Sequence, residues 1–282
     1  MRVFKKRLDI ENDVAVLQKQ NKTIGFVPTM GALHDGHLAL VKKAMAENDV
    51  VIVSIFVNPT QFNNSEDLSK YPRNLDQDLT ILSNFSSEIM VFAPSPEEIY
   101  GTETVATSYD FEGLEHEMEG KFRSGHFDGV GTVLKHLFTI TSPTKAYFGE
   151  KDFQQLQIVK KLVAIENMSV TIVGCPIYRE ESGLALSSRN KRLLPEQLKA
   201  APLIYKILTQ VKNDFGTKSV TTISDWVSQQ FQKEALLTLE YFEIAKVSDL
   251  KSIKRKQKNT NYRAFIAVFA GEVRLIDNIA LN

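Results

Sequence analysis

The feature that most constrains the fold is an apolar run of eight residues at positions 50–57 (VVIVSIFV), which only Ser54 interrupts. Eight residues are too few for a membrane-spanning helix, which needs about 20. Apolar residues at successive positions are typical of a strand that helices cover on both faces of a parallel sheet. The run follows a β-rich segment at 22–30, a glycine loop and an amphipathic stretch. This order predicts a β-α-β unit and an α/β fold with a Rossmann-like, doubly wound parallel sheet.

The amphipathic stretch has the period of a helix. Its apolar residues Leu38, Val41, Ala44 and Met45 recur at steps of three and four, while charged residues occupy the opposite face. Asp35 stands just before this pattern and is the expected N-cap of the helix.

The alternation of helix and strand patterns continues through the first 176 residues. We expect helices at 76–85, 130–139 and 153–166, and strands at 88–92, 145–148 and 169–173. Beyond Pro176, helical patterns at 196–212 and 219–237 precede β-rich runs at 239–247 and 262–269. The sequence therefore predicts a Rossmann-like domain at 1–176 and a smaller C-terminal α+β domain at 177–282.

The overall charge balance argues against a nucleic-acid or membrane partner. The chain has 34 Lys+Arg and 34 Asp+Glu, so its formal net charge is zero and no overall field draws it to polyanions. One basic run at 251–258 (KSIKRKQK) makes nucleic-acid binding the alternative from a different functional class. It contains no interleaved aromatic residues, and a solvated loop explains it better. We expect no nucleic acid and no membrane among the partners.

Cys175 is the only cysteine, so neither an internal disulfide nor a cysteine-rich zinc cluster is expected. It precedes a proline at a strand end and is expected to be a small buried residue. The N-terminus turns acidic and polar before any apolar stretch long enough for a signal peptide. These features predict a cytoplasmic protein.

The glycine loop at 31–37 (GALHDGH) lies where the chain passes from the first strand of the β-α-β unit to its helix. Parallel sheets bind ligands at this edge, because helix N-termini present free N–H groups and the positive end of the helix dipole. Gly31 and Gly36 are expected to bracket a turn that phosphates can approach, and His34 and His37 add side-chain donors. The spacing mimics a Walker-type loop but lacks its Lys and hydroxyl residues. A polar helix cap or a metal-binding pair of histidines remains the alternative.

Six segments together resemble one family. The first, PTMGALHDGH at 28–37, resembles the HIGH-type signature of nucleotidyltransferases in the form found in the pantothenate synthetase (pantoate–β-alanine ligase) family. The others are FVNPTQF, YPR, MEGKFRSGHFDGVGTVL, YFGEKDFQQL and REESGLALSSRNKRL, at 56–62, 71–73, 118–134, 147–156 and 179–193. The resemblance covers most of the first 195 residues and is much less specific beyond them.

This resemblance implies an ATP-dependent ligase. It would condense pantoate with β-alanine to pantothenate through a pantoyl-adenylate intermediate, releasing AMP and pyrophosphate. The alternative within the same superfamily is another HIGH-type nucleotidylyltransferase that acts on a phosphorylated substrate.

The resemblance also implies which residues bind ATP. They are Met30, Gly31, Ala32, Leu33, His34, Asp35, Gly36, His37, Gly149, Glu150, Lys151, Asp152, Tyr178, Leu186, Ser187, Ser188 and Arg189. Among these, His37 is the implied proton donor, with His34 and Lys151 as further catalytic residues. The segment 186–189 (LSSR) takes the place of the KMSKS loop that closes over the triphosphate in related adenylating enzymes. Tyr178 departs from the family, in which a smaller aliphatic residue is more usual.

The chemistry of the first step agrees with these residue types. A carboxylate with a pKa around 4 is already ionised at pH 7, so pantoate needs no general base to attack the α-phosphorus of ATP. The step needs positive charge and donors aimed at the phosphate oxygens. The sequence supplies such groups in His34, His37, Lys151, Ser187, Ser188 and Arg189.

Neutral amides suit pantoate, because they bind its hydroxyls without adding negative charge near the reacting carboxylate. The resemblance implies that Gln61 and Gln155 bind pantoate, with Gln61 also near the β-alanine site. Weaker candidates for the same pocket are Asn58, Arg123 and Val133. Arg123 is followed by Ser where family members often have Pro, so that loop is expected to be less rigid.

Some expectations concern groups outside the chain or its moving parts. Mg²⁺ is expected with ATP, but it usually keeps several waters, so no metal ligands are assigned. The polar segment 59–74 is placed to act as a flap, although a passive surface loop explains it nearly as well. The C-terminal domain is expected to lie over the cleft as a lid. The resemblance implies a homodimer.

Overall fold

A computed structural model of the chain describes residues 1–62, 68–69 and 71–282. The chain forms two compact units. Unit 1 contains Met1–Glu150 and Gln154–Pro176, and unit 2 contains Lys151–Phe153 and Ile177–Asn282. The expected flap at 59–74 lies partly outside the described residues.

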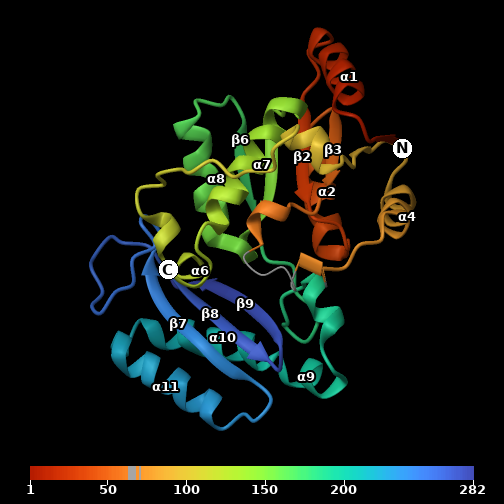
Figure 1. Cartoon of the computed structure of the whole chain (residues 1–282). Helices are drawn as coiled ribbons and strands as arrows, with labels where there is room; N and C mark the ends of the chain where they lie inside the picture. The colour runs from red at the N-terminus through yellow and green to blue at the C-terminus, as the bar shows by residue number, and fades with distance from the viewer. Residues whose placement is uncertain (63–67, 70) are drawn as a thin grey trace. The chain divides into compact units, whose positions relative to one another are not determined.

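Unit 1 is built on a parallel sheet of six strands in the order β1-β4-β3-β2-β5-β6 (Figure 1). The strands are β1 (Arg2–Phe4), β2 (Ile24–Thr29), β3 (Val50–Ile55), β4 (Met90–Phe92), β5 (Lys145–Gly149) and β6 (Thr171–Cys175). From β2 the chain adds β3 and β4 on one side and later β5 and β6 on the other. The order therefore reverses between β2 and β5, which is where doubly wound sheets bind ligands. The predicted Rossmann-like parallel sheet is confirmed.

Helices cover both faces of this sheet, as the continuous apolar strands require. The longer ones are α1 (Arg7–Lys19), α2 (Asp35–Glu47), α4 (Leu75–Phe85), α7 (His126–Thr141) and α8 (Phe153–Ile165). Val27 of β2 packs in a cluster with Val41 of α2 and Leu82 of α4. The next residue back, Phe26, points to the opposite face. There its ring lies 6.0 Å from the ring of Phe138 in α7.

Short elements join these helices and strands near the carboxyl ends of the strands. They are η1 (Pro59–Gln61), α5 (Pro96–Tyr100), η2 (Leu114–His116), α6 (Glu119–Phe122) and η3 (Glu150–Asp152).

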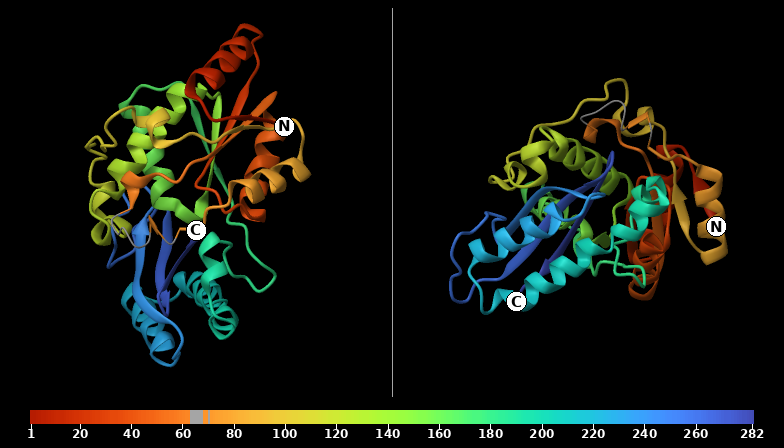
Figure 2. Two further views of the ribbon diagram at one scale, coloured as in Figure 1. Left: turned by 45° about the vertical axis from the view of Figure 1, so that its right-hand side comes forward. Right: turned by 90° about the horizontal axis from the view of Figure 1, so that it is seen from below.

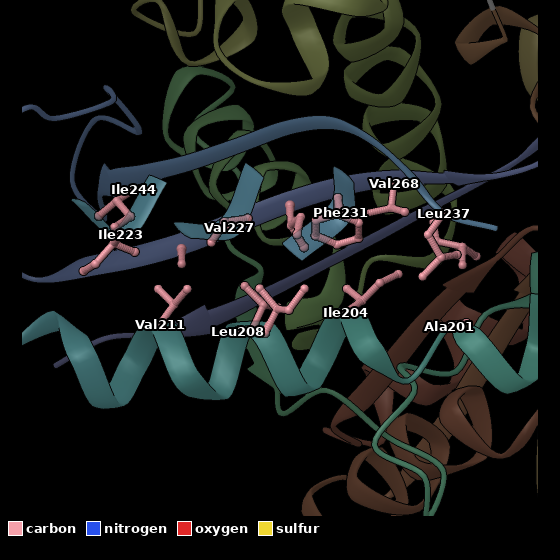
Figure 3. Packing of buried hydrophobic residues seen from close by; sticks show 14 of the residues in the cluster. Ala201, Ile204, Leu208, Val211, Ile223, Val227, Phe231, Leu237, Ile244 and Val268 are labelled. Carbon is pink, nitrogen blue, oxygen red and sulfur yellow. The ribbon is translucent and has the colours of Figure 1, made fainter. Parts of the chain in front are cut away.

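Unit 2 is a three-stranded antiparallel sheet in the order β7-β8-β9 with helices on one face (Figures 1 and 2). Its elements are η4 (Ser188–Arg192), α9 (Pro195–Ala200), α10 (Leu203–Phe215), α11 (Val220–Gln232), β7 (Thr238–Lys246), β8 (Tyr262–Ala270) and β9 (Val273–Ala280). Leu208 and Val211 of α10, Val227 of α11 and Val268 of β8 belong to its buried core (Figure 3). The predicted smaller α+β part is confirmed.

The structure corrects the predicted elements at several points. The helix expected at 196–212 is interrupted between α9 and α10, where Pro202 precedes Leu203 and supplies no N–H for a continuous helix. Helix α1 and the last strand, β9, were absent from the sequence prediction. The residues of β9 (VRLIDNIA) place two polar residues in its second half, which weakens the apolar pattern of a buried strand.

Candidate active site

The loop after β2 is held in place by hydrogen bonds that its main-chain N–H groups donate to side chains. The N–H groups of Ala32 and Leu33 donate to the two carboxylate oxygens of Asp78 in α4, at 3.0 and 2.8 Å. Gly31 N donates to Thr29 Oγ1 at 3.2 Å. Asp78 is only 2% exposed. Sequence analysis missed this residue, because in the sequence it is one acidic residue of an amphipathic helix.

These bonds revise the expected role of the two glycines. Gly31 has a φ of +79°, and a Cβ there would lie 2.9 Å from Asp78 Oδ2, so the turn requires glycine. Gly36 does not close the turn but lies in α2, and its N–H donates to His34 Nδ1 at 3.1 Å. The main-chain N–H groups of both glycines, and of Ala32 and Leu33, are thus already bonded within the protein. Side chains of the loop are therefore the stronger candidates for phosphate donors.

His34 is the N-cap of α2, so the expectation that Asp35 has this position is wrong. His34 Nδ1 accepts from an N–H, which places the proton of the neutral ring on Nε2 and makes that atom a donor. The rings of His34 and His37 lie 4.0 Å apart at an angle of 33°. The positive end of the α2 dipole and two imidazoles thus meet at the carboxyl edge of β2.

The chain after β3 brings Gln61 to the same loop. Gln61 is buried, and its Nε2 lies 2.9 Å from the sulfur of Met30. Its Oε1 accepts from Asn58 Nδ2 at 3.2 Å. The structure therefore brings together Met30, Asn58 and Gln61 from two separate strand ends.

Asn58 is surrounded by protein partners. Its Nδ2 also donates to Gly129 O at 3.1 Å, and its Oδ1 accepts from Thr60 N at 3.3 Å. Tyr100 donates to the same oxygen, and burial raises the pKa of Tyr100 to about 12, so the hydroxyl stays protonated. Because Gly129 O only accepts and Thr60 N only donates, the orientation of the Asn58 amide is fixed. Asn58 in turn fixes the amide of Gln61 with its nitrogen toward Met30.

Arg123 and the N-terminal part of α7 lie against the main chain of Gln61. Gln61 O accepts from Arg123 Nη2 at 3.4 Å and lies 2.8 Å from Nδ1 of His126, which sequence analysis missed. A Cβ on Gly129 would lie 2.4 Å from Thr60 O, so glycine allows this close approach. Val133, one turn beyond Gly129 in α7, is buried on the same side of the helix.

The two adjacent glutamines of α8 have different environments. Gln154 is 4% exposed, and its amide is occupied by Glu119 N at 3.0 Å and by the carbonyls of Leu114 and Glu117. Gln155 is half-buried and makes no side-chain hydrogen bond within the described part of the chain. It is not joined by a hydrogen bond to the cluster around Gln61. Of these two glutamines, Gln155 is therefore the one whose amide is available to a ligand.

The candidate segment 149–152 is divided between the two units. Gly149 ends β5, which pairs with β2, and Glu150 follows it in unit 1. Lys151 and Asp152 belong to unit 2. The Lys151 side chain is 18% exposed, with its Nζ 4.0 Å from Asp152 Oδ1.

In unit 2 the candidate segment 186–189 continues from a short hairpin. Tyr178 O accepts from Leu186 N at 3.0 Å, so Tyr178 uses its carbonyl within the hairpin, and the residue is 45% exposed. Ser187 is the N-cap of η4, and its hydroxyl accepts from Arg189 N. Ser188 is buried and Arg189 half-buried.

Among the described residues, no group of three His, Cys, Asp or Glu side chains could hold a metal ion. Within the same residues, no helix is long and apolar enough to cross a bilayer. Cys175 is buried, and this burial raises the pKa of its thiol to about 11. The thiolate form that a nucleophile needs is therefore scarce near neutral pH.

Comparison with known proteins gives the same family throughout. A family model described as pantoate-beta-alanine ligase matches residues 2–280. A pantothenate synthetase of Christiangramia forsetii is 54% identical over 282 residues, which is the full length of both chains. Crystal structures of the enzymes from Thermus thermophilus and Francisella tularensis have TM-scores of 0.90 and 0.82 at 38% and 40% identity. Each covers 100% of this chain, with 99% and 98% of the solved chains matched. The Francisella structure is of a complex with beta-gamma ATP and beta-alanine.

Proposed function

The chain belongs to the pantoate-beta-alanine ligase family, and from this premise we propose how its residues carry out the reaction. The reaction is the ATP-dependent condensation of pantoate with β-alanine to pantothenate, through a pantoyl adenylate and with release of AMP and pyrophosphate. The matches extend over the whole chain and name this activity, so the alternative of another HIGH-type nucleotidylyltransferase has no support.

The close pair of His34 and His37 rings at the start of α2 is the observation that carries the proposal. The first step moves negative charge onto phosphate oxygens while an ionised carboxylate attacks, so it depends on donors and not on a base. His34 Nε2 and the His37 ring provide donors where the α2 dipole also favours an anion. We assign the proton donor role to His37 and the orientation of the phosphates to His34.

The remaining ATP-binding groups come from the loops that follow β2 and β5 in unit 1, and from unit 2. In unit 1, Met30–His37, Gly149 and Glu150 lie at the carboxyl ends of β2 and β5, the pair at which the strand order reverses. In unit 2, Lys151 and Arg189 supply positive charge for the triphosphate, and Ser187 and Ser188 supply hydroxyls. Leu186, Asp152 and Tyr178 complete the proposed set. The lid role of residues 177–282 stays a prediction.

Pantoate binding is assigned to Gln61 and Gln155, and Arg123 and Val133 are assigned to the border of the pantoate site. The amide nitrogen of Gln61 points to Met30, in the loop that carries the two histidines. Asn58 uses both ends of its amide within the protein, so we propose that it positions Gln61 and does not bind pantoate itself.

Mg²⁺ is proposed to accompany ATP, where it neutralises phosphate charge. It usually keeps several waters and few protein ligands, and Asp78, the buried acid beside the loop, is already bonded to two N–H groups. We therefore assign no protein ligand to the metal.

We also propose that the protein is a cytoplasmic homodimer. The single, buried cysteine suits a reducing compartment. The dimer follows from the family resemblance, and sedimentation equilibrium of the purified chain tests it directly.

Isotope exchange tests the proposed first step. Labelled pyrophosphate should enter ATP when pantoate and Mg²⁺ are present, with no need for β-alanine, because adenylation is reversible and precedes the amine. Omitting pantoate should abolish the exchange. Exchange that is driven instead by an amino acid or a phosphorylated alcohol would contradict the proposal.

A further inference from the structure

The second half of β9 carries two adjacent buried polar residues. Asp277 is 5% exposed and Asn278 is 1% exposed. Successive side chains of a strand point to opposite faces of the sheet. Asp277 shares its face with Val273 and Leu275, which belong to the core beneath α10, whereas Asn278 points to the other face. The two side chains therefore contact different segments of unit 2.

Asn278 holds the segment Lys151–Phe153. Its Oδ1 accepts from Arg263 Nη1, and its Nδ2 donates to Lys151 O at 2.9 Å. A guanidinium only donates and a carbonyl only accepts, so both ends of this amide are fixed. The Arg263 guanidinium also lies 3.9 Å from the centre of the Phe153 ring. The main chain of Lys151 and the ring two residues later are thus both held by the same face of the sheet.

Asp277 holds the hairpin that leads to Arg189. Arg179 forms two parallel hydrogen bonds with the Asp277 carboxylate, at 2.6 and 2.8 Å. Its guanidinium lies 3.7 Å from the centre of the Tyr205 ring in α10 and donates to Gly183 O at 3.1 Å. Arg179 bridges to Ala185 across the hairpin, four residues before Arg189.

We propose that Asp277 and Asn278 are positioning residues that fix the two cation-bearing segments of unit 2, around Lys151 and Arg189, relative to each other. The inference rests on the proposed function of those two side chains in ATP binding. A buried ion pair contributes little net stability compared with apolar residues of the same volume. Two parallel hydrogen bonds between a guanidinium and a carboxylate do, however, constrain the relative geometry of the two side chains. Rigid placement of charged donors matters in phosphoryl-type transfer, where a displacement of about 1 Å costs up to about 10²-fold in rate.

Asn278→Asp is the sharpest variant, because it keeps the shape and the acceptor for Arg263 but places an oxygen opposite Lys151 O. We expect the Kd for a non-hydrolysable ATP analogue to rise about tenfold. The matched control is Asn282→Asp. Asn282 also joins a strand N–H, that of Tyr262, to a loop carbonyl, that of Thr260, but it contacts neither segment. The control should bind the analogue as the wild type does.

A double-mutant cycle separates positioning from general stability. If Asn278 acts through Lys151, then Asn278→Asp should change the Kd less than twofold in a Lys151→Ala background. An equal tenfold effect in both backgrounds would overturn the inference, as would an unchanged Kd in the single variant. Urea unfolding of each variant identifies conditions in which all four proteins are folded. If Asn278→Asp does not fold, Asn278→Ala removes the same bond and replaces it in the cycle.

Asp277→Asn tests the part of the proposal that concerns Arg189, in a second double-mutant cycle with Arg189→Ala. Glu240→Gln is its matched control, because Glu240 pairs with Arg274 in the same sheet and contacts neither segment. Asp277→Asn should weaken analogue binding several-fold in the wild type and have little effect once Arg189 is removed. If Lys151→Ala and Arg189→Ala bind the analogue normally, the proposed function of these side chains is wrong. If they bind weakly but both cycles are additive, the proposed function of Lys151 and Arg189 stands, and the proposal that Asp277 and Asn278 position them is wrong.

Discussion

Two of the segments proposed to bind phosphate, the loop 30–37 of unit 1 and the segment 186–189 of unit 2, are held in different ways. In unit 1 the loop 30–37 is held by its main chain, through N–H groups that donate to Asp78 and Thr29. In unit 2 the segment 186–189 follows a hairpin that is held by a charged side-chain pair, Arg179 and Asp277. Side chains of the first loop other than His34, which caps α2, can therefore change without moving its backbone. In unit 2, we expect a change of Arg179 or Asp277 to move the donor side chains of the segment 186–189.

The largest expected effect is that of a donor in the first loop. His37→Ala should lower kcat for adenylation about 10²-fold or more, by analogy with the loss of one charge-stabilising donor. The unfolding free energy should hardly change, because Asp78 holds the loop through its main chain. Pyrophosphate exchange and urea unfolding measure the two effects. His116→Ala, at a side chain that is 80% exposed, is the matched control. A His37 variant with full exchange activity would remove this residue from the mechanism.

The second prediction concerns Asp78, which supports the loop, and here both stability and ATP affinity should fall together. Asp78→Asn puts an NH₂ group opposite a main-chain N–H, and we expect a loss of about 1–3 kcal/mol in unfolding free energy with a parallel loss of ATP affinity. Asp76→Asn, in the exposed first turn of the same helix, should leave both quantities unchanged. If Asp78→Asn keeps wild-type stability, main-chain bonding does not hold this loop.

Arg189→Lys tests the donor in unit 2. Lysine keeps the charge but loses the forked geometry that binds two phosphate oxygens, so we expect about tenfold weaker ATP binding. Titration calorimetry measures the affinity. Exposed Lys191 lies in the same short helix, and Lys191→Ala serves as the control. Equal affinities in all three proteins would exclude Arg189 from the phosphate site.

The smallest effect is expected where the hairpin turns. Gly183 has a φ of +89°, and a Cβ would lie 2.6 Å from Cδ1 of Tyr205, the residue that stacks on Arg179. Gly183→Ala should cost about 1 kcal/mol of unfolding free energy and less than threefold in kcat/KM. Gly216→Ala is the matched glycine control, because a Cβ at that position would have nothing within 4 Å and the φ of Gly216 is −68°. Equal unfolding free energies for these two variants would show that the turn carries no strain.

Much of unit 1 could be predicted from the sequence, because its signals are local. The apolar run at 50–57 indicates a strand covered on both faces, and the period of Leu38, Val41 and Ala44 follows from the geometry of one helix. The family resemblance also rests on contiguous segments. The predictions were weakest in unit 2, where Pro202 divides a continuous helical pattern and β9 carries two buried polar residues.

What the sequence by itself determined was the parallel α/β sheet, the position of the histidine loop between the first strand of the β-α-β unit and its helix, and the family. Only the tertiary structure decided which N–H groups of that loop are already bonded, which way the amide of Gln61 points, and that Asp277 and Asn278 hold two distant segments. A periodic pattern reflects the geometry of one stretch of backbone and is visible along the chain. The partner of a buried polar side chain depends on which remote segment folds against it, and no local pattern specifies that.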